Sequence, residues 1–155
     1  MPNIREAART IILDEKQEKI AVLEVKNGDY HKIPGGGIEN GESAEMAAIR
    51  EALEEGACDV RLIEMIGEAK FTDPNDPNLF HHSVCFLAQK IKDHQTSYFT
   101  EEELANKFRL LWLSFEEAIS LFEKVRSTVP FEIKMNNRDL NFIKIAKKHF
   151  SNRLK

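Results

Sequence analysis

The feature that most constrains this chain is a run of three glycines, Gly35–Gly37, a few residues before a helix-forming acidic stretch at 43–56. Ser43 can cap this helix, whose interior is rich in Ala, Met, Ile, Leu, Arg and Glu. At about 100° per residue, the carboxylates of Glu51, Glu54 and Glu55 share one face. The sequence therefore predicts a turn of bare backbone next to a helix with a strongly acidic side.

We expect the apolar residues Met46, Ile49 and Leu53 to form the buried stripe of this helix, leaving the acidic face to look outward or into a cleft. Glu54 and Glu55 fall in the last turn, where the helix dipole disfavours each carboxylate by about 0.3 to 1 kcal/mol. Many acidic helices are simply solvated. Here, however, a bound Mg²⁺ or Mn²⁺ would relieve the crowding, and the glycine backbone could lend the metal a carbonyl or amide.

The rest of the chain predicts a mixed α/β (α+β) fold with helices on both faces of the sheet. β-branched runs separated by a polar segment indicate a hairpin, and two longer alternating stretches flank a turn rich in Asp, Pro and Asn. We expect strands at 6–13, 19–25, 30–33, 59–71, 79–91 and 108–113, a loop at 92–107, and further helices at 115–125 and 137–152.

Size and composition indicate a single domain over residues 1–155. The net charge of −4 argues against a nucleic-acid polymer as partner, and no apolar run is long enough for a signal peptide or a membrane span. The two cysteines, Cys58 and Cys85, have no metal-binding spacing. We therefore expect a cytoplasmic protein, monomeric or homodimeric, without a membrane partner.

The stretch from Gly36 to Cys58 resembles the Nudix hydrolase family, whose box reads G-x5-E-x7-R-E-U-x-E-E-x-G-U, with U an apolar residue. The glycine, the first glutamate and the Arg-Glu…Glu-Glu group fall in register at Gly36, Glu42, Arg50, Glu51, Glu54 and Glu55. One position departs, because Ala57 stands where the family has its late glycine. The departure concerns how the helix ends. The resemblance implies a Nudix-like α/β/α sandwich with a mixed sheet between helices.

The resemblance also implies roles for individual residues. Glu51, Glu54 and Glu55 would be metal ligands together with the Gly35 carbonyl, and Glu51 could instead be the base that orients water. Arg50 would hold Glu51 in place, while Gly36, Gly37 and Glu42 would support the metal and phosphate site. Many family members take a further catalytic carboxylate from a loop before the Trp-bearing strand. The candidates are Glu101, Glu102 and Glu103, although Thr100 and Glu103 also form a helix-capping pattern.

The implied activity is Mg²⁺-dependent cleavage of a diphosphate bond in a nucleoside diphosphate linked to another moiety. Oxidised nucleoside triphosphates, ADP-ribose and sugar nucleotides all remain open as substrates. We expect base recognition by loops 71–80 and 95–103, whose aromatics are Phe71, Phe80, Tyr98 and Phe99. His81 and His82, adjacent on a strand, should point to opposite faces. The alternative is a Nudix-like regulatory domain that binds a nucleotide without cleaving it.

Overall fold

The computed structural model describes residues 2–94 and 96–153. Within them, strands form one mixed sheet in the order β3-β2-β1-β6-β5, with β4 paired to β1 and β7 to β2. Among the described residues, β1 and β6 are the only strands that pair in parallel. The strands are β1 (Asn3–Leu13), β2 (Ile20–Val25), β3 (Tyr30–Lys32), β4 (Gly35–Gly37), β5 (Cys58–Asp73), β6 (Asp76–Asp93) and β7 (Arg109–Leu113).

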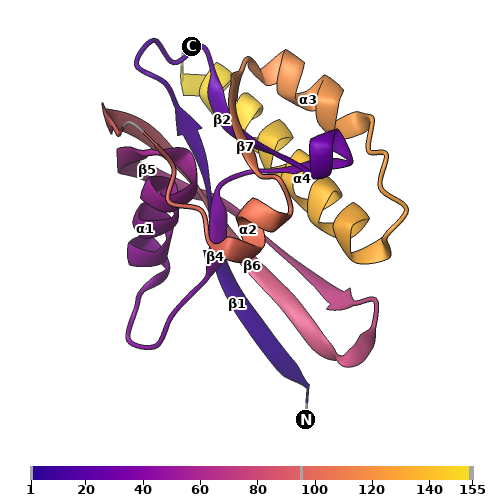
Figure 1. Ribbon diagram of the computed structural model, residues 1–155. Helices are drawn as coiled ribbons and strands as arrows, with labels where there is room; N and C mark the ends of the chain where they lie inside the picture. Colours follow the sequence, from indigo (N-terminus) through magenta and orange to yellow (C-terminus); the bar gives the residue numbers. More distant parts are fainter. Residues whose placement is uncertain (1, 95, 154–155) are drawn as a thin grey trace.

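Helices cover both faces of this sheet, as the sequence predicts (Figure 1). They are α1 (Ala44–Gly56), α2 (Glu101–Ala105), α3 (Phe115–Glu123) and α4 (Pro130–Arg153), and a short 3-10 turn, η1 (Lys26–Gly28), precedes β3. Alternation along β1 builds both cores: Ile11 and Leu13 pack toward α3 and α4, whereas Ala8 and Ile12 pack with residues of α1. No helix of the described residues is long and apolar enough to cross a membrane.

The expected strands and the α1 and α3 helices are confirmed, with shifts of a few residues at their ends. Three segments differ. Gly35–Gly37, predicted as a turn, form the short strand β4, which pairs antiparallel with β1. Residues 101–105, predicted as loop, form the short helix α2, which begins with a capping box between Thr100 and Glu103. Helix α4 begins at Pro130 rather than at 137. Proline suits a first helical turn because its missing N–H would have no helical partner there.

The predicted buried stripe of α1 is wrong. Met46 and Ile49 are 57% and 43% exposed, and the buried residues are alanines together with Glu51 and Glu55. Ala47, Ala48 and Ala52 are fully buried because their small side chains let the helix axis come close to the sheet. The acidic face follows the alanines inward, so its carboxylates enter a cleft.

Candidate active site

A cleft of about 450 Å³ opens where β4 lies between the C-terminal half of α1 and helix α2. Figure 1 shows these elements close together, with β4 between α1 and α2. The glycine strand forms part of its wall, and the charged side chains that line it are Arg5, Arg9, Lys32, Glu51, Glu55, Glu102 and Glu103. Residues from five elements thus converge on one stretch of bare backbone.

Glu51 lies against Gly36. A Cβ atom at Gly36 would sit 2.4 Å from the Glu51 Oε1, so the side chain occupies the space that any residue other than glycine would fill. Burial raises the pKa of Glu51, and a hydrogen bond of 2.9 Å from the Arg50 Nη1 opposes that rise. The glycine is therefore needed here for close packing against a carboxylate.

Glu55 is the most deeply placed acid of the cleft, with 1% of its surface exposed. The Gly35 N–H donates to its Oε1 at 2.9 Å, and the Lys32 Nζ lies 3.6 Å from its Oε2. The same ammonium donates to the Gly35 carbonyl at 3.3 Å. Burial raises the pKa of Glu55 to about 8 despite the nearby lysine.

Glu103 meets Glu55 from the opposite wall. Their carboxyl groups share a hydrogen bond, which requires a proton between them. Burial acts against ionisation of Glu103, yet the hydrogen bonds from Glu55 and from the Thr100 N–H lower its pKa. The proton therefore belongs to Glu55. The Glu103 carboxyl group caps helix α2 and also lines the cleft. The two roles considered for Glu103 are therefore compatible.

Arg50 gathers the remaining acids of α1 and the preceding loop. It donates to Glu42 from Nε at 2.8 Å and from Nη2 at 3.0 Å, and from Nη1 to Glu54 at 3.2 Å. Its Nη2 also donates to the Gly37 carbonyl at 3.0 Å. The hydrogen bond from Arg50 lowers the pKa of Glu42 to about 2. Glu42 and Glu54 thus lie at the rim, attached to the guanidinium, rather than among the cleft-lining residues.

Helix α4 holds the strand that leads into the glycines. The Asn136 Oδ1 accepts from the His31 N–H, and the Asp139 Oδ2 accepts from the Ile33 N–H, both at 3.0 Å. Both α4 side chains are fully buried. The interpretation of the sequence missed Lys32, Asn136 and Asp139. The available signal was the spacing of Asn136 and Asp139, which are three residues apart and so lie on one face of a helix. The local sequence does not show that this face meets a strand.

The predicted aromatic contacts do not form the cleft. Phe71 stacks on His81, Phe80 lies under the Lys70 ammonium, and neither Tyr98 nor Phe99 lines the cleft. Two aromatic rings do line it, Tyr30 and Phe108. Phe99 contacts Phe108 edge-on, and Lys32 lies over the Phe108 ring. His81 and His82 point to different surroundings, as expected: one bonds Asp73, the other Glu6 and Glu68.

The donors of the cleft suit a hard divalent cation. In the described part of the chain, no three acidic, histidine or cysteine side chains are already arranged around a metal position. Instead, an ammonium and a shared proton neutralise Glu55, whose buried carboxyl is otherwise disfavoured as an anion. A divalent cation bound by Glu55, Glu51 and the Gly35 carbonyl would take the place of the ammonium and the shared proton. These residues therefore fit a divalent cation.

The fold and the acidic cleft together define an α/β protein of the Nudix type. The chain belongs to this family, because the NUDIX domain model matches residues 3–132. The expected resemblance and fold class are thereby confirmed, and the membership supports the expected class of enzyme, a Nudix pyrophosphohydrolase.

Individual proteins are similar to this chain to different extents. A Bacillus subtilis (strain 168) protein named "Putative 8-oxo-dGTP diphosphatase" is 38% identical over 82 residues, which is 51% of this chain and 53% of the relative. The match thus spans about half of that protein. A NUDIX hydrolase from Nitrosomonas europaea has a TM-score of 0.64 at 19% identity, covering 91% of this chain and 89% of the other. The MutT protein from Methanosarcina mazei Go1 scores 0.62 at 18% identity, covering 96% of each.

Proposed function

We propose that this protein is a Mg²⁺-dependent hydrolase that cleaves a diphosphate bond in a small nucleotide. The observation that carries the proposal is the convergence of Glu51, Glu55 and Glu103 on the backbone of Gly35 and Gly36. Bringing a half-buried acid, Glu103, against the buried Glu51 and Glu55 is costly unless a cation or a proton compensates them. A structural role would not require so expensive an arrangement next to an open cleft.

Glu51, Glu55 and the Gly35 carbonyl would hold the cation, with Glu54 available once it leaves Arg50. When bound, Mg²⁺ offsets the negative charge of the diphosphate and its leaving group. Glu103 has the lowered pKa of a carboxylate that is ionised at neutral pH, so it can accept a proton from the attacking water. Arg50 fixes Glu51 by a charge-assisted hydrogen bond. Glu51 as the base remains the alternative assignment.

The substrate that we propose is a nucleoside triphosphate, oxidised purine nucleotides included. The name of the Bacillus subtilis relative supports this choice, and ADP-ribose or sugar nucleotides are the competing substrates. Phe108 is positioned to stack on the base, since of the two aromatic residues that line the cleft it is the more exposed, whereas Tyr30 is buried. Mn²⁺ would fit the same oxygen donors.

The experiment is product release from a panel of nucleoside triphosphates, ADP-ribose and a sugar nucleotide, with Mg²⁺ and with EDTA. We expect Mg²⁺-dependent release of pyrophosphate and nucleoside monophosphate from at least one triphosphate. Tight nucleotide binding without turnover under any metal condition would favour the regulatory-domain alternative instead.

Glu103 and Glu102 give a matched pair for the choice of base. Both line the cleft, but only Glu103 shares a hydrogen bond with Glu55. We expect Glu103→Gln to lower kcat by about 10² to 10⁴ with little change in Mg²⁺ affinity, and Glu102→Gln to have a much smaller effect. A near-normal kcat for Glu103→Gln would return the role of base to Glu51.

We also propose that residues 1–155 act as one domain in a reducing, cytoplasmic compartment. Helix α4 extends beyond residues 3–132, which the family model matches, yet it packs on the same core as β1 and α3, and this packing supports one domain. Cys58 and Cys85 are buried free thiols, which suits such a compartment. Sedimentation would distinguish a monomer from a homodimer.

A further inference from the structure

A second, smaller cavity of about 150 Å³ adjoins the catalytic cleft. It lies between the β1–β6 part of the sheet and the first half of α4. It shares Arg5, Arg9, Gly37 and Met135 with the cleft, so the two spaces are neighbours around the same glycine strand. The cavity contains no acidic lining residue, in contrast to the cleft. Its new lining groups include Arg138, Ser83 and His81.

Arg9 brings a buried positive charge to this cavity. It is 8% exposed, and its Nε donates to the Ser83 Oγ at 3.5 Å. No ion pair of Arg9 within 4.0 Å is found in the described part of the chain. Burial first, and then the neighbouring Arg138, lower the pKa of Arg9 to about 10, which leaves it protonated at neutral pH. The carboxylates of Asp139, Glu55 and Glu51 favour the charged form of Arg9. Because none of them forms a direct ion pair with it, a bound anion would stabilise the buried guanidinium further.

Arg138 adds a second buried guanidinium. Its side chain is 5% exposed, its Nε donates to the Asp139 Oδ1 at 2.8 Å, and its Nη2 is buried with no hydrogen-bond partner among the described residues. One carboxylate carries a single negative charge, so Asp139 cannot neutralise both arginines, and of the two only Arg138 pairs with it directly. The Arg138 Nη2 is therefore a charged donor that no group among the described residues uses.

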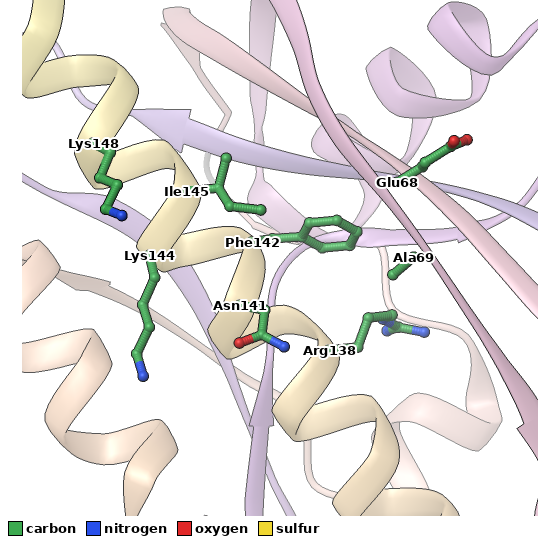
Figure 2. A pocket seen from close by; sticks show the side chains of 8 residues that line it. All are labelled: Glu68, Ala69, Arg138, Asn141, Phe142, Lys144, Ile145 and Lys148. Carbon is green, nitrogen blue, oxygen red and sulfur yellow. The ribbon is translucent and has the colours of Figure 1, made fainter.

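The direction of Arg138 separates it from the other cations of α4. Figure 2 shows its side chain extending from α4 toward β5 and ending near Ala69, whereas Lys144 and Lys148 point away from that side. The two lysines are exposed and belong to an outer groove of about 380 Å³ between β5 and α4. Arg138 thus forms the wall between the outer groove and the inner cavity.

We propose that the inner cavity is a phosphoryl-binding subsite, in which Arg9 and Arg138 bind the terminal phosphoryl group of a nucleoside triphosphate whose diphosphate bond is cleaved in the adjoining cleft. This assignment rests on the proposed function. A cavity of this volume holds about one benzene ring, so a phosphoryl group fits whereas a whole purine does not. Planar guanidiniums match phosphate oxygens in a bidentate geometry, and a neutral ring would leave both charges unpaired.

The first test is independent of catalysis and uses inorganic phosphate with metal-free protein in EDTA. At matched ionic strength with chloride, we expect phosphate to bind the wild type, measured by calorimetry and thermal shift. Arg138→Gln should weaken binding at least about tenfold, and Arg138→Lys, which keeps the charge but loses the fork, should be intermediate. Lys144→Gln is the matched control, expected within about twofold of the wild type.

Circular dichroism establishes which variants fold. If Arg138→Gln does not fold because Asp139 loses its partner, phosphate binding is compared in Arg138→Lys and Arg9→Lys instead. The proposal is overturned if phosphate binds the wild type no better than chloride does. It is equally overturned if the folded arginine variants bind phosphate as tightly as the wild type, or if Lys144→Gln loses as much.

The second test compares two substrates of the active wild type. Arg138→Lys should raise KM about tenfold for a nucleoside triphosphate while changing KM little for a nucleoside diphosphate linked to a neutral hexose, which has no third phosphoryl group. An equal rise for both would place Arg138 on the shared diphosphate and overturn the assignment. If the wild type hydrolyses neither, the proposed function fails, whereas the phosphate-binding test still decides the subsite.

Discussion

Helix α1 packs against the glycine strand β4 and helix α4 packs against β3, and the two helices bring opposite chemistry. Helix α1 presents Glu51 and Glu55, two buried acids whose pKa values are raised by burial. Helix α4 presents Asn136 and Asp139, which accept hydrogen bonds from the backbone of β3, and Arg138, which faces the adjoining cavity. Helix α1 supplies the buried acids of the site, which cost stability, whereas helix α4 fixes the backbone around the site. Substitutions on the two helices should therefore have different consequences.

The largest effect is expected on the α1 side. Glu55→Gln should lower kcat/KM at least about 10²-fold, because a lost metal ligand removes part of several kcal/mol of charge stabilisation. Glu54→Gln is the matched neighbour at the rim and should cost clearly less. Steady-state kinetics at saturating Mg²⁺ would measure both. Equal losses would mean that Glu54 moves into the cleft during turnover.

The same Glu55→Gln variant also separates function from stability. The folded-state pKa of Glu55 lies above its ordinary value, so metal-free protein should lose stability as pH rises from about 4.5 toward about 8. The substitution removes that loss, and its Tm in EDTA should exceed that of the wild type at pH 8 but not at pH 4. Parallel Tm curves for the two proteins would contradict the assignment of the proton to Glu55.

The glycine strand should respond next. In Gly36→Ala the new Cβ would meet the Glu51 carboxylate, and displacing that group by about 1 Å should lower kcat about 10²-fold. Nothing lies within 4 Å of a Cβ at Gly37, so Gly37→Ala should cause a much smaller loss. Kinetics of the two variants, with their melting temperatures, tests this difference. Similar losses of kcat in the two variants would show that the glycines are needed for their backbone conformation and not for the room they leave to Glu51.

On the α4 side the expected change is in stability. Asn136→Ala leaves the buried His31 N–H and the Phe122 carbonyl without their partner and should cost about 1 to 3 kcal/mol of unfolding free energy. Asn137→Ala, one residue further and exposed, should cost less than about 0.5 kcal/mol. Urea denaturation measures both. A large kcat loss in Asn136→Ala without destabilisation would show that α4 takes part in the chemistry.

The smallest effect concerns the end of α1. Ala57 caps the helix in the left-handed conformation, with φ at 54°, at the position where the Nudix pattern has glycine. Ala57→Gly should therefore stabilise the protein by up to about 1 kcal/mol, since glycine adopts this conformation without a Cβ penalty. The same denaturation series would detect it, and a loss of stability would show that the buried methyl group contributes more than the strain costs.

Short-range features of this protein follow from its sequence alone. The capped helix at 43–56, the hairpin and the fixed spacing of Gly36, Glu42 and the Arg50–Glu55 group depend on neighbours along the chain. Even the departure at Ala57 was correctly attributed to the helix end. Such features are legible because local hydrogen bonds and helical periodicity involve residues only a few positions apart.

The tertiary structure decided which surfaces turn inward and what they meet. Periodicity shows that Glu51 and Glu55 share a face, but only the close approach of alanines to the sheet buries that face instead of Met46 and Ile49. The contact of Glu103 with Glu55 and the pairing of α4 side chains with β3 join residues far apart in the chain. Their energies depend on burial and on partners that no local pattern specifies, because both arise only when the sheet and its helices pack together.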